Sequence, residues 1–176
     1  MLEIKNVHKT FNKGTINEKK ALNGVEIHLN PGDFVTIIGG NGAGKSTSLN
    51  MIAGVYPIDQ GTIILDGKDI SDWPEYKRAS LIGRVFQDPM MGTAANMSIE
   101  ENLAMAYRRG KKRGLGWGVT KKERSLFKER LKMLDLGLED RMTTKVGLLS
   151  GGQRQAITLL MATLQKPSIL LLDEHT

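Results

Sequence analysis

The chain has 176 residues, no cysteine, and a formal net charge of +6. This length suffices for one domain with a sizeable core, and the lack of cysteine excludes a disulfide framework and thiol chemistry. Met1 is followed by no signal-peptide pattern, and no apolar run approaches the roughly 18 residues of a membrane helix. We therefore expect a soluble chain that reaches a membrane only through a partner.

The first part of the chain is predicted to be rich in strands. Alternating or β-branched apolar runs at Leu2–Val7, Val25–Leu29 and Phe34–Ile38 are typical of strands, and the last of them is predicted to be buried. The polar segment Asn12–Lys20 is expected to be a surface loop, and Pro31-Gly32-Asp33 a turn.

A glycine-rich loop follows. Residues 39–46 have the pattern Gly-x4-Gly-Lys-Ser, and apolar residues at helical spacing lead from there to Gly54, a typical helix end. Glycines let the backbone approach a phosphate closely, and successive N–H groups at a helix N-terminus bind anions. Lys45 adds a positive charge and Ser46 a hydroxyl for a metal ion. The sequence therefore predicts a nucleoside triphosphate site, and an ordinary glycine-rich turn is the alternative.

The middle of the chain contains several local start and stop patterns. Asp66-Gly67 between two apolar runs predicts a hairpin. Pro74–Ser80 is expected to be a short helix, and Ile82–Phe86 a strand. Ser98 and Thr120 each precede a glutamate by three residues, so both predict capping boxes that begin helices.

Positive charge is concentrated in residues 108–124, which carry eight lysines and arginines. A solvated loop and helix start is one interpretation, and a surface facing anionic lipid or a partner protein is another. Nucleic acid is a third, although Trp117 alone could stack a base there and no recognised binding motif surrounds it.

Two motifs near the end of the chain complete the pattern. A serine and two glycines at Ser150–Gly152 would expose N–H groups at a helix start as a second anion site, and a plain capped helix is the alternative. After Pro167, the apolar run Ile169–Leu172 predicts a buried strand that ends in Asp173 and Glu174. Asp173 can hold Mg²⁺, usually through water, and Glu174 can orient or deprotonate an attacking water. An acidic strand end without such a role is the alternative.

The run Leu-Ser-Gly-Gly-Gln at 149–153 matches the signature motif of the ABC (ATP-binding cassette) ATPases, and the order of all the motifs matches as well. The chain resembles this family over essentially its whole length. The resemblance implies an α/β P-loop NTPase fold, with a mixed sheet around the P-loop helix, antiparallel N-terminal strands and an α-helical signature subdomain. Residues 1–176 would form a single ATP-binding domain, with its ATP-binding core at 1–87 and 165–176 and its helical subdomain at 88–164.

The family's roles carry over to matching positions. Lys45 would contact the β- and γ-phosphates, Gln87 would reach the Mg²⁺ or the water, and Glu174 would be the general base. Ser46, Gln87 and Asp173 would be the Mg²⁺ ligands. The positions expected to bind ATP are Phe11, Gly39, Gly40, Asn41, Gly42, Ala43, Gly44, Lys45, Ser46, Thr47, Ser150, Gly151, Gly152 and Gln153.

Some positions depart from the family pattern. Phe11 stands where the family more often has a tyrosine that stacks on adenine, and a core or strand-edge aromatic is the alternative. His175 stands where the family usually has proline, and neither it nor His8 or His28 matches the family's switch histidine, which lies on a later strand. The family's D-loop is not found either. We therefore expect a truncated cassette that binds nucleotide and hydrolyses it poorly.

In this family the signature of one subunit contacts the γ-phosphate held by the P-loop of another. The resemblance therefore implies a head-to-tail homodimer with two ATP molecules between the subunits. An integral-membrane permease would dock near Asp88–Ser98, at the cytoplasmic face of the cell membrane. Segments such as Gln87–Thr93 are most similar to bacterial importer cassettes whose permeases are of the branched-chain amino-acid type. Import of a small organic solute such as an amino acid, with an extracellular solute-binding protein, is therefore expected.

Two other functions remain open at this point. One is a soluble ABC ATPase that acts on nucleic acid or the ribosome, and the other is a regulatory cassette that moves no solute. Proteins of the first kind usually carry two cassettes or a long coiled coil between the P-loop and the signature. This chain has one cassette and no sustained heptads, so nucleic acid is not the expected partner.

Overall fold

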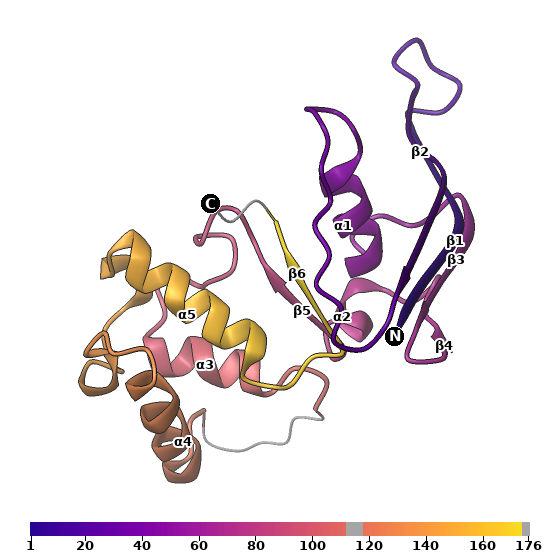
Figure 1. Cartoon of the computed structure of the whole chain (residues 1–176). Coiled ribbons are helices and arrows are strands. Elements are labelled where there is room, and N and C mark those ends of the chain that lie inside the picture. Colours follow the sequence, from indigo (N-terminus) through magenta and orange to yellow (C-terminus); the bar gives the residue numbers. More distant parts are fainter. Residues whose placement is uncertain (112–117, 174–176) are drawn as a thin grey trace. The chain divides into compact units, whose positions relative to one another are not determined.

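A computed structural model describes residues 1–111 and 118–173 of the chain (Figure 1). They belong to two compact units, Met1–Ile82 and Gly83–Thr176. The division predicted from the resemblance, a core at 1–87 and 165–176 with a helical subdomain at 88–164, stays a prediction. None of the helices in the described ranges is long and apolar enough to span a bilayer.

The first unit is built on an antiparallel sheet. A bulge at Asn6, with φ of +47°, shifts the alternation of the first strand, so that Leu2, Ile4 and Val7 are all buried. Both N-terminal strands extend beyond their predicted ends, and the predicted loop at 12–20 is reduced to the tip of a hairpin. The strands, in the spatial order β2-β1-β3-β4, are β1 (Leu2–Phe11), β2 (Lys19–Leu29), β3 (Gln60–Leu65) and β4 (Lys68–Asp69).

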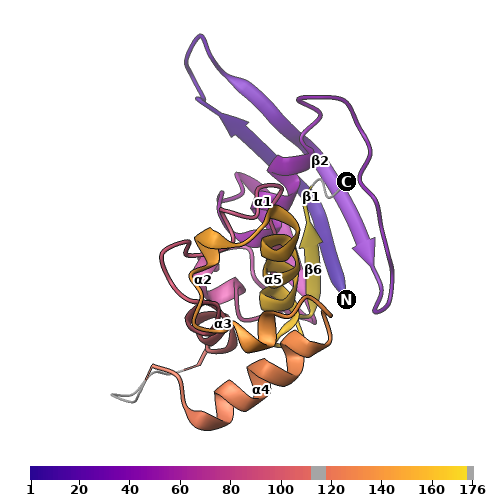
Figure 2. The ribbon, with the colours of Figure 1, turned by 90° about the vertical axis from the view of Figure 1, so that its left-hand side faces the viewer.

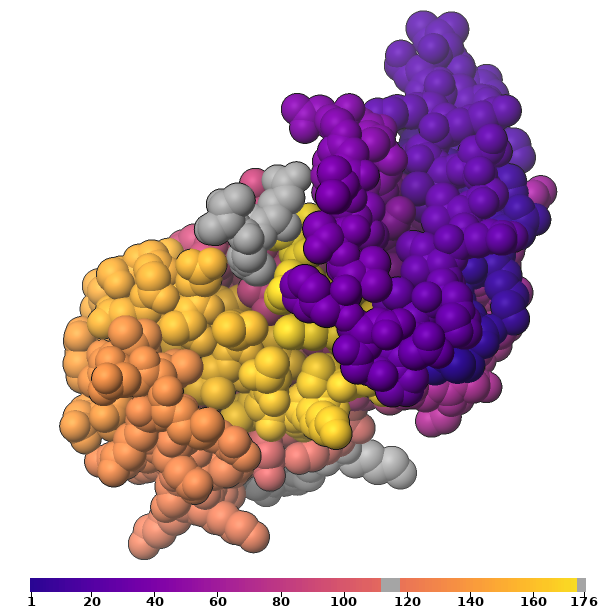
Figure 3. Space-filling view, in the orientation of Figure 1, coloured from indigo at the N-terminus to yellow at the C-terminus, as the bar shows by residue number. Residues whose placement is uncertain are grey.

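The predicted buried strand at Phe34–Ile38 is wrong. The structure assigns no strand between β2 and the first helix, and Phe34 and Ile38 are 88% and 90% exposed. A strand needs neighbours for its backbone N–H and C=O groups, and none of the strands in the described ranges pairs with this segment. Figure 3 shows the stretch between β2 and the first helix on the surface of the first unit. The glycine loop is therefore reached through an exposed, irregular segment.

A buried arginine fixes the far end of the first helix. Helix α1 (Lys45–Ala53) ends at Gly54, which has a φ of +86°, as predicted. Arg78, the last residue of the short helix α2 (Glu75–Arg78), is 1% exposed and donates to the carbonyl oxygens of Met51 and Ile52 at 2.7 and 3.0 Å. The last carbonyls of a helix have no partner within the helix, so Arg78 supplies one and holds α1 in place.

The second unit is mainly helical. Its buried cluster includes Leu103, Phe127, Leu131, Val146 and Ile157. The predicted capping boxes at the starts of α3 and α4 are confirmed. In each, the N-cap side chain accepts a hydrogen bond from the backbone N–H of the glutamate three residues later, and the side chain of that glutamate accepts one from the N-cap backbone N–H. The helices are α3 (Ile99–Tyr107), α4 (Lys121–Lys132), α5 (Gly151–Thr163) and two short 3-10 helices, η1 (Leu138–Asp140) and η2 (Val146–Leu148).

Two short strands, β5 (Ile82–Val85) and β6 (Ile169–Leu172), lie side by side with α5 against them (Figures 1 and 2). They run parallel, because Gly83 lies beside Leu170 and, further along both strands, the Asp173 N–H donates to the Val85 carbonyl at 3.2 Å. A Cβ atom on Gly83 would lie 2.8 Å from the carbonyl oxygen of Ala162 on α5, so glycine allows this close packing.

The prediction that the last strand is buried holds only in part. Leu171 is 5% exposed, whereas Leu172 is 42% exposed. Successive side chains of a strand point to opposite faces of the sheet, so Leu171 and Leu172 lie on different faces and only one of them is buried.

Candidate nucleotide-binding site

The glycine loop rests on β2. Gly44 has a φ of +90°, and a Cβ atom there would lie 2.8 Å from the carbonyl oxygen of Ala21 and 2.9 Å from Leu22 Cδ2. Both the backbone conformation and the close approach therefore require glycine at this position. Residues 40–43 are exposed, so the loop presents its backbone to solvent while β2 supports it from the other side.

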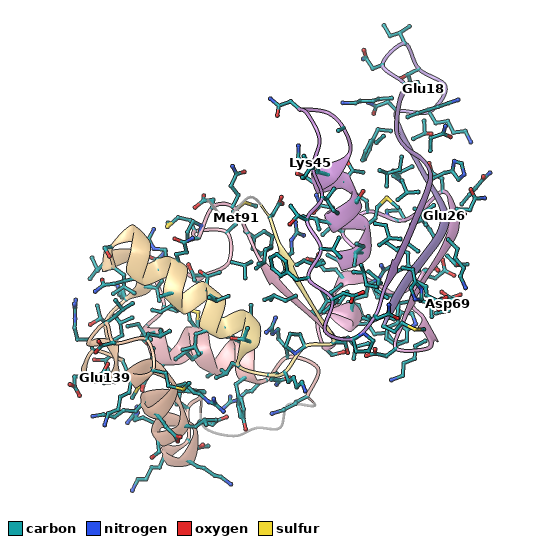
Figure 4. All side chains as sticks on the ribbon, in the orientation of Figure 1. Glu18, Glu26, Lys45, Asp69, Met91 and Glu139 are labelled. Carbon is teal, nitrogen blue, oxygen red and sulfur yellow. The ribbon has the colours of Figure 1, made fainter. Side chains whose placement is uncertain are left out.

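Lys45 lies at the start of α1 and turns back over the loop (Figure 4). Its Nζ donates to the carbonyl oxygens of Gly39 at 2.6 Å and Gly40 at 3.1 Å. The ammonium group is thereby held over the same backbone that the sequence predicts to bind phosphates. Ser46, the next residue, is exposed.

The first turn of α1 is suited to an anion. No side chain caps its N-terminus, and the turn contains no acidic residue. The first N–H groups of a helix have no partner within the helix, and the helix dipole adds a partial positive charge there. The glycine loop, Lys45 and this helix start therefore combine three sources of positive potential.

Phe11 is the last residue of β1 and is partly buried. Its ring meets Tyr56 edge to face, with centroids 5.2 Å apart, and Lys9 Nζ lies 5.6 Å from its centroid. Sequence reasoning missed the contact of Phe11 with Tyr56, because aromatic contacts between distant residues have no local pattern. Adenine stacking by Phe11 stays a prediction.

In the second unit, the carboxyl ends of β5 and β6 bring Asp173 close to Arg84. Arg84 Nη2 lies 3.9 Å from Asp173 Oδ2, and the two side chains are only 13% and 18% exposed. Gln87 follows β5 after one residue and is exposed. The contact between Arg84 and Asp173 was missed in the sequence, where Arg84 is simply one residue of a strand.

The signature residues begin α5 with a reciprocal cap. The Gln153 N–H donates to Ser150 Oγ at 3.3 Å, and the Ser150 N–H donates to Gln153 Oε1 at 3.2 Å. Gly151 and Gly152 are exposed, and a Cβ atom on either would meet nothing within 4 Å. Arg154, which the sequence did not single out, donates to the carbonyl oxygen of Leu149 at 3.1 Å and so anchors the preceding loop.

The predicted site residues fall into two groups. Phe11 and Gly39–Thr47 belong to the first unit, whereas Gln87, Ser150–Gln153 and Asp173 belong to the second. The structure brings Lys45 onto the glycine loop and Asp173 beside Arg84. The predicted general base, Glu174, lies outside the described residues.

Comparisons with known proteins identify the class. A family model described as ABC transporter matches residues 22–176. The chain therefore belongs to the ABC transporter family of ATP-binding proteins, which are ATPases, and the family resemblance inferred from the sequence is confirmed.

Two relatives with named functions show which kinds of transport protein the chain is similar to. The chain is 42% identical to a tyrosine transport ATP-binding protein of Clostridioides difficile (strain R20291), over 100% of this chain and 70% of that protein. It is 37% identical to the spermidine/putrescine import ATP-binding protein PotA of Haemophilus influenzae (strain ATCC 51907 / DSM 11121 / KW20 / Rd), over 99% of this chain and 42% of PotA. The chain thus spans less than half of the PotA relatives.

Solved structures confirm the α/β cassette fold. The dimeric ATP-binding cassette MJ0796, described in a post-hydrolysis state with ADP and Pi, matches with a TM-score of 0.81 at 32% identity, over 99% of this chain and 74% of that one. CbiO1 from Clostridium perfringens, described as part of the ABC transporter complex cbiONQ, matches with a TM-score of 0.75 at 26% identity, over 98% of this chain and 64% of that one.

Proposed function

We propose that this chain binds and hydrolyses ATP for an ABC importer, and that it couples ATP-driven dimerisation to solute movement through a partner permease. The observation that carries the proposal is the position of Lys45. Its ammonium group is held within 2.6 and 3.1 Å of two loop carbonyls, at the uncapped start of a helix. A γ-phosphate at this position would meet the lysine charge, the loop N–H groups and the helix dipole together.

The predicted metal ligands suit Mg²⁺. Magnesium prefers oxygen ligands and is commonly bound by one or two carboxylates together with substrate phosphates. The Asp173 carboxylate, partly buried at a strand end, and the exposed Ser46 hydroxyl at a helix start are donors of this kind. Within the described ranges, no three histidine, cysteine or acidic side chains are placed so that they could hold a metal ion by themselves. When bound, Mg²⁺ would neutralise phosphate charge, and Gln87 would contact it or the water.

The chain's own groups would do the rest. Lys45 and the loop N–H groups would bind and orient the phosphates, and Glu174 would accept a proton from the attacking water. Ser150–Gln153 would supply the second anion site from another copy of the chain in a head-to-tail homodimer. The exposed glycines at the start of α5 leave room for a phosphate there.

A permease would dock on the loop after β5. Within the predicted docking segment Asp88–Ser98, Met90 and Met91 are 44% and 71% exposed, and Figure 4 shows Met91 on this loop. Large exposed apolar patches mark interaction surfaces, and these two adjacent methionines would contribute apolar contacts to such a surface. The relatives are named for transport of tyrosine and import of spermidine or putrescine. These names support a small nitrogen-containing solute, an amino acid in our proposal, delivered by an extracellular solute-binding protein to a transporter whose cassettes lie at the cytoplasmic face.

The ATP assignment is tested by Lys45→Ala. We expect its affinity for a fluorescent ATP analogue to fall at least about tenfold, because a charge-assisted contact to phosphate is lost. Lys68→Ala removes a lysine from exposed β4 in the same unit and is the matched control. Equal affinities for the two variants would contradict the proposal.

A further inference from the structure

A lysine at the start of β2 reaches the glycine loop. A Cβ atom on Gly42, in the middle of that loop, would lie 3.8 Å from Lys19 Nζ. Lys19 and Gly42 are both exposed. Within the described ranges, no hydrogen bond or ion pair engages the Lys19 ammonium group. This second cation beside the loop is therefore available to a ligand.

We propose that Lys19 is a further nucleotide-binding residue, whose ammonium group contacts the α- and β-phosphates of ATP or ADP above the glycine loop. It adds a positive charge from the sheet to those that the loop and helix α1 supply. This inference rests on the proposed function, in which the loop and Lys45 bind ATP.

The backbone holds Lys19 near the loop on two sides. Across the hairpin, Lys19 pairs with Phe11, the last residue of β1. Two residues further along β2, the carbonyl oxygen of Ala21 lies 2.8 Å from the place that a Cβ atom on Gly44 would occupy. The strand that carries Lys19 is thus fixed against the loop, and the flexible stem of the side chain can adjust to a bound phosphate.

The position of Lys19 indicates which part of a nucleotide it meets. In the predicted binding mode, adenine stacks on Phe11 and the γ-phosphate contacts Lys45. Lys19 lies opposite Phe11 and reaches Gly42 in the loop. The α- and β-phosphates connect the adenosine to the γ-phosphate, so they are the groups that we expect Lys19 to contact. Both are present in ADP as well as in ATP, so this contact should not discriminate between the two nucleotides.

The measurement is the affinity for the fluorescent analogues mant-ATP and mant-ADP, with EDTA present to remove metal ions. Lys19→Met keeps the apolar stem but removes the charge, and we expect both affinities to fall about fivefold at low ionic strength. In about 0.5 M NaCl the loss should shrink to less than about twofold, because salt screens an exposed contact. Lys19→Arg should stay within about twofold of the unaltered protein because the charge remains.

Two further variants make the result specific. Lys20→Met removes the same charge from the neighbouring residue of β2, whose side chain points to the opposite face of the sheet, and should leave both affinities within about twofold. Lys45→Ala should weaken the binding of mant-ATP more than that of mant-ADP, because Lys45 is predicted to contact the γ-phosphate. Lys19→Met should weaken both to the same extent.

The outcomes separate two kinds of failure. If Lys19→Met behaves like Lys20→Met, weakens only mant-ATP, or acts equally at both salt concentrations, the role of Lys19 is refuted while the assignment of the loop stands. If Lys45→Ala changes neither affinity, the assignment of the loop in the proposed function is itself wrong.

Discussion

Glu123→Gln should destabilise the helical unit by about 2 kcal/mol at neutral pH, and this loss should shrink in acid. Arg108 Nη2 donates to Glu123 Oε2 at 2.7 Å and to Oε1 at 2.9 Å, and the Thr120 N–H donates to Oε2 at 2.8 Å. The Arg108 guanidinium, with the Thr120 cap, lowers the pKa of Glu123 from 4.5 to about 2. The pair links the end of α3 to the start of α4.

The magnitude follows from that shift. A pKa shift of this size corresponds to about 3 kcal/mol in the free energy of unfolding. The Arg108 and Glu123 side chains are still 24% and 14% exposed to solvent, which reduces this contribution to about 2 kcal/mol. Because the pKa is lower in the folded protein, the stabilisation is complete above pH 4.5 and is lost as the pH falls from 4.5 towards 2.

Urea unfolding at pH 7 and at about pH 3.5 provides the assay. Glu129→Gln, at an exposed position on the same helix, is the control. We expect the difference in the free energy of unfolding between the unaltered protein and Glu123→Gln to be smaller by about 1 kcal/mol at the lower pH. A difference that does not change with pH, or that equals the effect of Glu129→Gln, would refute the reasoning.

Two more predictions concern the segments that support the site. Asn102 is fully buried and bonds to the backbone of residues 94, 97 and 98, so Asn102→Leu should cost about 3 kcal/mol in urea unfolding, and an unchanged midpoint would contradict this role. Gly44→Ala should lower ATP affinity more than tenfold, on the order expected for a displaced phosphate loop, because its Cβ would meet Ala21. Gly67→Ala has a similar positive φ and open space around it, so it should strain the backbone without changing ATP affinity. Equal affinities in the two variants would show that the contact with β2 is unimportant.

Local patterns predicted much of the fold. Serine or threonine three residues before glutamate marked the starts of α3 and α4, and Asp66-Gly67, both with positive φ, marked the β3–β4 hairpin. Gly54 marked the end of α1. These features depend on residues within a few positions of one another, so the sequence alone is informative about them.

Predictions that depend on neighbours in space were less successful. Phe34–Ile38 has a strand-like composition, but a strand forms only where another strand pairs with it. The buried Arg78 that caps α1 was likewise not anticipated, because its partners lie 26 and 27 residues away.

The candidate site shows the same contrast. The glycine loop, the signature and Asp173 follow from motifs, and the family to which the chain belongs agrees with them. The contacts of Arg84 with Asp173 and of Arg154 with Leu149 arise from packing and carry no motif. The roles of the motif residues in ATP binding remain predictions.

The most direct test of the proposed head-to-tail site mixes two inactive variants. Lys45→Ala disables the P-loop, and Gly152→Asp places a negative charge where the signature would meet phosphate. Gly152 has open space around it, and an acidic residue is favourable in the first turn of a helix, so this variant should fold.

Sedimentation in the presence of ATP then measures whether each variant, and their mixture, forms a dimer. Neither variant should form an ATP-dependent dimer alone, whereas their mixture should, because the P-loop of one copy and the signature of the other make one intact site. If the mixture stays monomeric with ATP, or if either variant alone dimerises as the unaltered protein does, the signature does not complete the ATP site of a second copy.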